Sequence, residues 1–312
     1  MRVRFWGVRG SLPTPLSSAQ LRSKISAILE RISPDDLESP RTRERFLAEL
    51  PPWLFGVVGG NTPCVEVRTE GNEVLIFDAG TGIRELGVAV AKERPKPSRY
   101  RMFFSHLHWD HIQGLPFFGP AYDPSVSIDF HAPFDGLEAV LRDQMCAPRF
   151  PVGLDVMGAQ KRFVKLNEPL CVGDAQISWR RMNHPGASYS YAVTEGVKRI
   201  VYATDTELSS DDFLRDDENA AFFGGADLIV IDAQYTLGEA IEKYSWGHSA
   251  FSLAADFASN WGIRKLVLFH HDPTYDDKKL YGILQSARWY IDHMSIKGVE
   301  VMLATEGTEI RI

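Results

Sequence analysis

Short apolar segments recur along the chain between polar connections, and their length and spacing predict β-strands. The first two segments are joined by Glu-Gly-Asn-Glu and a later pair by Glu-Gly, which is typical of β-hairpins. The last two segments are apolar at almost every position, as expected for strands buried on both faces of a sheet. We expect strands at residues 65–69, 74–77, 100–105, 126–131, 177–182, 189–193, 199–203, 228–231 and 265–269.

Two other stretches have a helical period. Residues 251–260 precede the last expected strand and are apolar at helical spacing. Residues 276–294 form a longer amphipathic pattern whose apolar side consists of Leu280, Ile283, Leu284, Ala287, Tyr290 and Ile291. Hairpins combined with strand-helix-strand units predict an α/β (α+β) fold in which helices cover the outer faces of the sheets.

Residues 16–50 interrupt this pattern because they are rich in charge and contain two helix signatures. Ser17 or Ser18 can cap a helix that runs to about Ile32. The run Ser33-Pro34-Asp35-Asp36 offers a second N-cap followed by proline and two acids. We therefore predict a single domain over residues 1–312 with a helical insertion at about 16–50. Whether the insertion is a solvated surface hairpin, a lid or a dimer contact stays open.

Composition restricts the class of protein. The 312 residues are 44% hydrophobic, which is enough for a substantial core, and no run approaches the ~18 uncharged apolar residues of a membrane span. We expect a cytoplasmic protein with no membrane partner. Three cysteines without a CxxC pair argue against a disulfide framework and against a thiolate zinc site. A net charge of −7 disfavours a large nucleic-acid partner, which needs a basic face.

The segment SHLHWDHIQG, residues 105–114, contains three of the nine histidines. In an extended chain His106 and His108 project to the same side and can face one metal ion. Asp110 and His111 can face a second ion if the chain turns after His108. Imidazole and carboxylate ligands suit Zn²⁺, Mn²⁺ or Fe. Two ions need about six or seven ligands, so other ligands must lie elsewhere in the chain.

Further candidate ligands directly follow three of the expected strands. Asn183-His184-Pro185 follows 177–182, Thr204-Asp205-Thr206 follows 199–203, and His270-His271-Asp272 follows 265–269. Residues at the ends of several strands can converge on one site at the edge of a sheet. The spacing alone leaves open whether His270 or His271 is the ligand.

The motif HxHxDH, formed by residues 106–111, resembles that of the metallo-β-lactamase-fold hydrolases, as does its combination with His184, Asp205 and His270. GNTPC at residues 60–64 and FDAGTG at residues 77–82 also resemble that family. The resemblance implies a four-layer αββα sandwich with two divalent metals at one edge, expected to be Zn with Mn or Fe as alternatives. It implies that one metal is held by His106, His108 and His184, the other by Asp110, His111 and His270, and that Asp205 bridges them.

Three later motifs narrow the resemblance within this family. IDAQY at 231–235, GHSA at 247–250 and LFHHDPTY at 268–275 are similar to the closing motifs of the zinc-dependent tRNA 3′-processing endonucleases (RNase Z) and related phosphodiesterases. In that group an acid and a histidine beside the metals help to protonate the leaving oxygen, which implies Asp232 and His248 here. The endonucleases have Glu where this chain has Asp232, so the acid is shorter by one methylene.

The resemblance implies metal-assisted hydrolysis of a phosphodiester. Two cations roughly 3.5–4 Å apart activate a bridging hydroxide that attacks phosphorus in line. Asp110 would hold or deprotonate the attacking water, and His248, oriented by Asp232, would protonate the departing alkoxide.

The sequence restricts the identity of the substrate less than it restricts the type of reaction. RNase Z-type enzymes hold tRNA with a protruding Gly/Pro-rich arm. The corresponding candidate here, residues 148–160, is a short segment whose one basic residue is Arg149. We therefore expect a small phosphodiester or nucleotide, namely a 3′,5′-cyclic nucleotide. The alternatives are an RNase Z-like endonuclease acting on RNA 3′ ends and a nucleotide-binding sensor without hydrolysis. The sequence also leaves open whether the protein forms a homodimer.

Overall fold

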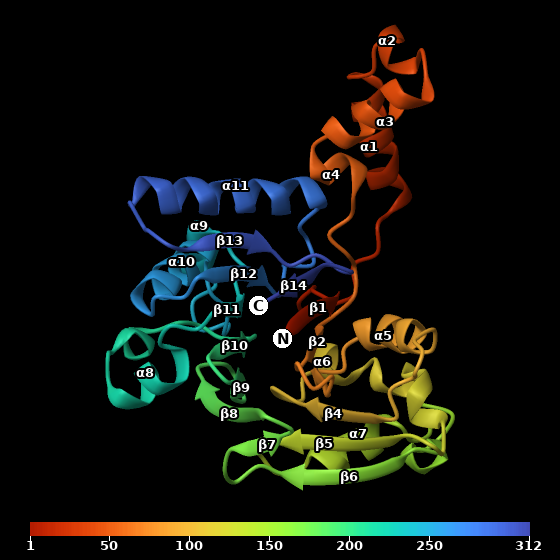
Figure 1. The fold of residues 1–312 in the computed structure, drawn as a ribbon, viewed down its shortest axis with the longest axis vertical. Helices are drawn as coiled ribbons and strands as arrows, with labels where there is room; N and C mark the ends of the chain where they lie inside the picture. The colour runs from red at the N-terminus through yellow and green to blue at the C-terminus, as the bar shows by residue number, and fades with distance from the viewer.

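The computed structural model describes residues 1–312 and contains two seven-stranded β-sheets that pack face to face (Figure 1). The first sheet has the strand order β14 (Glu309–Arg311), β1 (Arg2–Gly7), β2 (Cys64–Arg68), β3 (Val74–Phe77), β4 (Arg99–Phe103), β5 (Ser127–Ala132) and β6 (Gln160–Lys165). The second sheet has the order β13 (Glu300–Leu303), β12 (Lys265–Phe269), β11 (Leu228–Asp232), β10 (Lys198–Ala203), β9 (Ser188–Glu195), β8 (Ala175–Met182) and β7 (Leu170–Val172).

Helices cover the outer face of each sheet and complete the four-layer αββα sandwich that the sequence predicts (Figure 1). The first sheet packs against α5 (Gly82–Val90), α6 (Trp109–Ile112) and α7 (Leu137–Gln144). The second sheet packs against α8 (Asp217–Phe223), α10 (Phe251–Asn260) and α11 (Asp277–His293), and α9 (Leu237–Glu242) lies between β11 and α10 in the chain. None of the helices combines the length and the apolar character that crossing a bilayer requires.

The interface between the sheets is built from aromatic side chains that the strand pattern turns inward. Phe77 of β3 stacks on Phe103 of β4 with ring centroids 5.3 Å apart, and both rings contact Tyr191 of β9 at 5.6 Å. All three side chains are fully buried. Aromatic pairs of this kind contribute about 0.5–1.5 kcal/mol each beyond the area that they bury. They join β3 and β4 of the first sheet to β9 of the second.

The helical insertion lies between β1 and β2 and projects away from the sandwich (Figure 1). Its first helix, α1 (Ser18–Leu29), begins at the predicted cap, where Ser17 and Gln20 form a capping box. The sequence predicts a second helix from Ser33, but this helix, α2 (Pro34–Leu37), ends after one turn. Two further helices follow it, α3 (Pro40–Glu49) and α4 (Pro52–Phe55).

The insertion has more helices than the sequence predicts because serine followed by proline occurs twice within it. Pro40 cannot lie inside a helix, since its ring clashes with the preceding turn and it has no backbone N–H. Ser39 instead caps a new helix and accepts a hydrogen bond from Thr42 N. The chain therefore restarts at α3 rather than extending α2.

Candidate metal centre

The candidate ligands lie together because the strands that precede them end at one edge of the sandwich. Strands β10, β11 and β12 run parallel, so their carboxyl ends coincide, as they do at the ligand sites of open α/β sheets. Tyr189 N donates to Ser105 O (3.0 Å), which joins the second sheet to the segment after β4. The side chains that meet at this edge are His106, His108, Asp110, His111, His184, Asp205, Asp232, His248 and His270.

One ligand group consists of His106, His108 and His184, whose nearest ring nitrogens lie within 4.8 Å of one another. His184 donates from Nδ1 to Gly247 O (2.9 Å), which leaves its Nε2 3.3 Å from His108 Nδ1. His106 Nε2 is buried and has no hydrogen-bond partner in the chain. A buried ring nitrogen without a partner costs free energy unless a ligand binds it.

The second group consists of Asp110, His111, Asp205 and His270, all of them buried. Asp110 Oδ2 lies 3.3 Å from Nε2 of both His111 and His270. His111 Nε2 is a second buried nitrogen without a hydrogen-bond partner. The four side chains present nitrogen and oxygen atoms to one point, which is the donor set of a divalent metal.

Asp205 lies between the two groups. Its Oδ2 is 3.1 Å from His111 Nε2, and its Oδ1 is 3.8 Å from Nε2 of both His106 and His184. The backbone of Asp205 has a φ of 48°, and His270 has a φ of 59°. Such left-handed residues other than glycine cost about 1–3 kcal/mol and concentrate at functional sites. The carboxylate is thus held where each of its oxygens faces a different group.

Residues behind the ligands fix the orientation of the rings. Asp78 Oδ2 accepts hydrogen bonds from His111 Nδ1 (2.9 Å) and from the Tyr202 hydroxyl (2.8 Å). Gln234 Oε1 accepts from His270 Nδ1 (3.0 Å). Both contacts place the proton on Nδ1 and direct the Nε2 lone pair into the site, as partners of metal-binding histidines do. The sequence predicts that Asp78 fixes the glycine loop that follows it, and no signal in the sequence singles out Gln234 within the IDAQY motif.

The electrostatics of the site favour cation binding. Burial lowers the pKa of His106 well below its usual range, and it also lowers the pKa of His108 and His184, so these rings are neutral ligands. Burial acts to raise the pKa of Asp110, but the adjacent His111 outweighs it and holds that pKa well below its usual range. Burial also acts to lower the pKa of His111, but Asp205 and Asp110 outweigh it and raise that pKa well above its usual range, so the carboxylates stabilise positive charge at this point. The residues present therefore fit divalent metal ions.

Asp232 and His248 form the contact that the closing motifs imply. His248 Nδ1 donates to Asp232 Oδ2 at 2.6 Å, so the shorter acid still reaches the ring. Asp232 Oδ1 accepts from Ser249 N (3.1 Å), which keeps the carboxylate in place. The His248 ring stacks on that of His270, with centroids 5.0 Å apart, and so lies beside the ligand groups.

His271 belongs to neither ligand group. Its ring donates from Nε2 to Ala304 O (2.9 Å), and its backbone N–H donates to Val8 O (2.9 Å). Burial lowers the pKa of His271 to about 3, so the ring is neutral. The ring of His271 thus points to the Ala304 carbonyl, whereas that of His270 lies beside Asp110 and Asp205.

The site opens into a cleft of about 350 Å³. The cleft contains no lysine or arginine, and its lining consists of Ser11, His108, Asp110, His184, Pro185, Asp205, Trp246, His248 and His270. Trp246 is 62% exposed at its rim. An indole in that position offers a flat apolar surface to a bound ring.

Glu207 holds the loop that carries Trp246. Its Oε1 accepts from Ser245 N (3.1 Å) and its Oε2 from Gly247 N (2.9 Å). Gly247 has a φ of 88°, and a Cβ there would lie 2.3 Å from His184 Nδ1, so only glycine fits. The carboxylate thereby positions the carbonyl that orients His184. No signal in the sequence distinguishes Glu207 from an ordinary surface acid.

We expect Glu207→Gln to lower metal affinity and kcat/KM by roughly 10-fold to 100-fold, the usual cost of removing a partner behind a ligand. The amide retains one acceptor oxygen and loses the second N–H contact, so Gly247 O no longer fixes the His184 ring. Metal content after dialysis and turnover of bis-p-nitrophenyl phosphate measure the effect. Glu242→Gln, on the exposed side of α9, is the matched control. Equal metal affinity in both variants would contradict the positioning role.

Comparison with known proteins agrees with this architecture. Residues 73–271, more than half of the chain, match the family described as "Beta-lactamase superfamily domain". Ribonuclease Z of Natronomonas pharaonis is 26% identical over an alignment 278 positions long, and the match covers 69% of this chain and 82% of that protein.

Two solved structures share the fold over nearly the whole length. The metallo-beta-lactamase fold protein YhfI from Bacillus subtilis has a TM-score of 0.65 at 16% identity, covering 99% of this chain and 98% of that one. A diphosphatase from the PhnP family has a TM-score of 0.62 at 16% identity, covering 100% and 97%. The chain therefore belongs to the β-lactamase superfamily and is a metallo-β-lactamase-fold, metal-dependent hydrolase of the RNase Z-like group.

Proposed function

We propose that the protein hydrolyses a small phosphodiester, namely a 3′,5′-cyclic nucleotide. The reaction uses two divalent metal ions, which we expect to be Zn²⁺. The observation that carries this proposal is the meeting of two ligand groups and the Asp232–His248 pair in one cleft of about 350 Å³. Clefts near this volume take small ligands. The cleft has no lysine or arginine to follow a polynucleotide backbone, which supports a substrate with a single phosphodiester.

In this proposal His106, His108 and His184 would hold one ion and Asp110, His111 and His270 the other, with Asp205 placed between the two groups. The ions, when bound, supply Lewis acidity that activates water and offsets the charge of the phosphate oxygens. Asp110 accepts the proton of the attacking water. Asp232 keeps the proton of His248 on Nδ1, so that Nε2 delivers a second proton to the leaving alkoxide.

Trp246 is the proposed contact for the nucleobase. It lies at the rim of the cleft that also contains His184 and His248, and more than half of its surface is exposed. Stacking of a base on an aromatic side chain contributes about 1–3 kcal/mol and tolerates different bases. This arrangement supports binding of a nucleotide without specifying its base.

An RNA 3′-end endonuclease is the second candidate, because the relative in Natronomonas pharaonis is a ribonuclease Z. The projecting insertion also provides exposed basic side chains, Arg41, Arg43 and Arg45, on α3. These arginines lie outside the cleft and could contact only a long substrate.

Assay of the metal-loaded protein on three substrates separates the candidates. We expect cleavage of bis-p-nitrophenyl phosphate and of 3′,5′-cyclic AMP, with no cleavage of precursor tRNA. Cleavage of precursor tRNA without cleavage of cyclic AMP would establish the second candidate instead. Bound metal with no hydrolysis of any of the three would favour a nucleotide-binding sensor.

A further inference from the structure

The helical insertion exposes an apolar face on its first helix, α1. Leu21, Ile25 and Leu29 are spaced four residues apart, so they follow one another along one face of the helix. Their exposed fractions are 48%, 49% and 64%. Among residues 16–49, Lys24 is the one buried residue, whereas α10, a helix of similar length, buries five of its ten residues. The chain therefore leaves about half of this apolar face uncovered.

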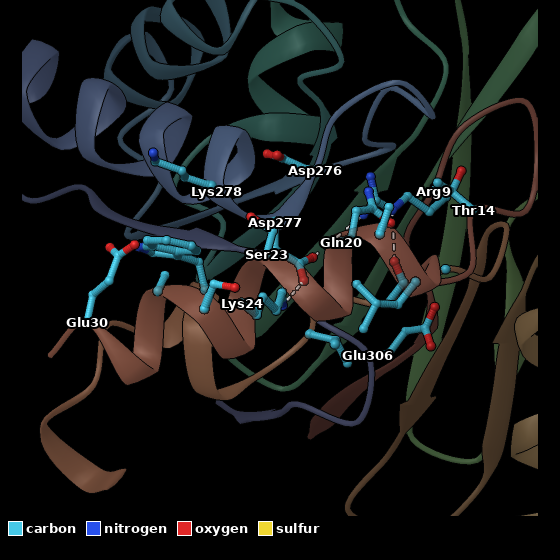
Figure 2. Close-up of a pocket in the computed structure, with 18 residues that line it drawn as sticks. Arg9, Thr14, Gln20, Ser23, Lys24, Glu30, Asp276, Asp277, Lys278 and Glu306 are labelled. Atoms are coloured by element: carbon cyan, nitrogen blue, oxygen red, sulfur yellow. Dashed lines mark hydrogen bonds and ion pairs between the residues drawn. The ribbon is translucent and has the colours of Figure 1, made fainter. Parts of the chain in front are cut away.

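The polar side of α1, rather than its apolar face, is turned toward the rest of the chain. A cavity of about 650 Å³, which Arg9 also lines, lies between α1 and the N-terminus of α11, and Lys24 pairs there with Asp277 of α11 (Figure 2). The residues of α1 that line this cavity are small or polar, namely Ala19, Gln20, Ser23, Lys24, Ser26 and Ala27. With 3.6 residues per turn, the apolar face lies on the opposite side of the helix. Helices at the surface of a monomer normally turn their apolar side inward, so this orientation indicates a further contact.

The energetics of the insertion indicate the same. Capping boxes fix the N-termini of α1 and α3, but α1 buries only Lys24 and α3 buries no residue. Helices of ten to twelve residues are marginal by themselves, and most of their stability in proteins comes from packing of an apolar face. The insertion therefore has an apolar face available for a contact outside its own chain.

The charges of the insertion favour a second copy of the chain as the partner. Residues 16–49 contain six acidic and six basic residues, so the net charge of −7 belongs to the rest of the chain. Lys24 is the one member of this set that forms an ion pair within the chain. Two copies can thus approach through the insertion without the repulsion that they meet elsewhere. RNA, by contrast, needs a basic surface, which a neutral segment does not provide.

The two helices at the far end of the insertion have opposite charge. Asp35 of α2 and Glu38 at its C-cap are exposed, and so are Arg41 and Arg45, which lie one turn apart on α3. Arg41 is in the first turn of α3, where the helix dipole favours negative charge. A two-fold axis repeats each contact, so α2 of each copy can face α3 of the other.

We propose that two copies of this chain associate through the insertion, with the apolar faces of α1 at the centre of the interface and α2 of each copy against α3 of the other. The insertion is then an oligomerisation element, separate from the metal cleft.

Sedimentation equilibrium of the full chain over a series of concentrations tests the association. We expect a reversible equilibrium between monomer and dimer in the wild type. Ile25→Asp should raise the dissociation constant at least about 10-fold, because it buries an unpaired carboxylate at the centre of the interface. Val197→Asp is the matched control, since Val197 is 97% exposed in the turn between β9 and β10, and it should associate like the wild type.

Charge exchange between α2 and α3 tests the pairing without a change in α1. One variant combines Asp35→Lys with Glu38→Lys, and the other combines Arg41→Glu with Arg45→Glu. Each variant alone should self-associate at least about 10-fold more weakly than the wild type, because like charges then meet at both contacts. An equimolar mixture should form a 1:1 dimer, because both contacts then join opposite charges.

Three results would each overturn the proposal: a wild type that stays monomeric at all concentrations, equal dissociation constants for Ile25→Asp and Val197→Asp, and a mixture of the two charge variants that stays monomeric. RNA binding by a monomeric wild type that is lost with Arg41→Glu and Arg45→Glu would assign these arginines to a nucleic acid instead. The association measurements use no substrate and no metal, so they stand apart from the outcome for phosphodiester hydrolysis.

Discussion

Asp110→Ala is expected to abolish hydrolysis of both bis-p-nitrophenyl phosphate and 3′,5′-cyclic AMP, with kcat lower by about 10³-fold or more. The carboxylate has two proposed tasks, as a ligand beside His111 and His270 and as the acceptor of the water proton. Its removal also leaves Ser11 N without its acceptor. We therefore expect the loss of about one equivalent of metal together with the loss of activity.

Steady-state kinetics and metal analysis of the same preparation measure both effects of this substitution. Asp155→Ala is the control, since Asp155 is 78% exposed and pairs with Arg142 at the surface. Asp110→Ala protein that keeps both its metal content and a tenth of its activity would contradict the assignment.

His248→Ala is expected to affect substrates according to their leaving groups. A general acid contributes about 10²–10⁴-fold where the leaving alkoxide is basic, as in a cyclic nucleotide. p-Nitrophenolate leaves without protonation, so its release should slow by less than about 10-fold. Equal losses on the two substrates would exclude proton donation by His248.

The pH profile provides an independent readout of the same histidine. Burial acts to lower the pKa of His248, but the Asp232 carboxylate, with Asp205 and Asp110 farther away, outweighs it and raises the pKa to about 9. The acid form therefore persists at neutral pH and is lost as the pH rises through that value. Metal cations bound in the adjacent site repel the imidazolium. The alkaline limb of the pH–activity profile should therefore lie at or below pH 9.

We expect kcat on cyclic AMP to fall along this alkaline limb in the wild type and to be flatter in His248→Ala. Asp232→Asn should move the limb to lower pH, because the amide no longer stabilises the imidazolium. If the alkaline limb lies at the wild-type pH in both variants, a group other than His248 is responsible for it.

The local sequence was enough to predict most of the strands and both long helices. Residues 251–260 and 276–294 are apolar at helical spacing, and α10 and α11 form within two residues of those bounds. The strands absent from the prediction are mostly those at the sheet edges, such as β6 (QKRFVK) and β7 (LCV). β6 is rich in charge and β7 has only three residues, so both lack the apolar pattern that marks central strands.

Some residues of the candidate site can likewise be predicted from a local motif, whereas others are found only from contacts between distant segments. HxHxDH is a local pattern, because an extended segment and a short turn suffice to place His106, His108, Asp110 and His111. Asp205, His184 and His270 each look like turn residues by themselves, and only their order after successive strands indicates ligands. The contacts of Asp78 and Gln234 with His111 and His270 join residues 33 and 36 positions apart, so no short motif reveals them.

The sequence by itself predicted a mixed α/β fold and nitrogen and oxygen ligands for a metal, because these follow from residue types and from the order of strands. The four-layer sandwich and the pairing of Asp232 with His248 came from the resemblance of the motifs to a known family. Only the tertiary structure separates the surroundings of His270 and His271, since the ring of His271 meets the Ala304 carbonyl and that of His270 lies beside Asp110. It also divided the insertion into four helices and formed the cavity beside Arg9. Those features require the packing of α1 against α11 and of residues 8–11 against the segment after β12, contacts between chain segments more than 200 residues apart that no local pattern encodes.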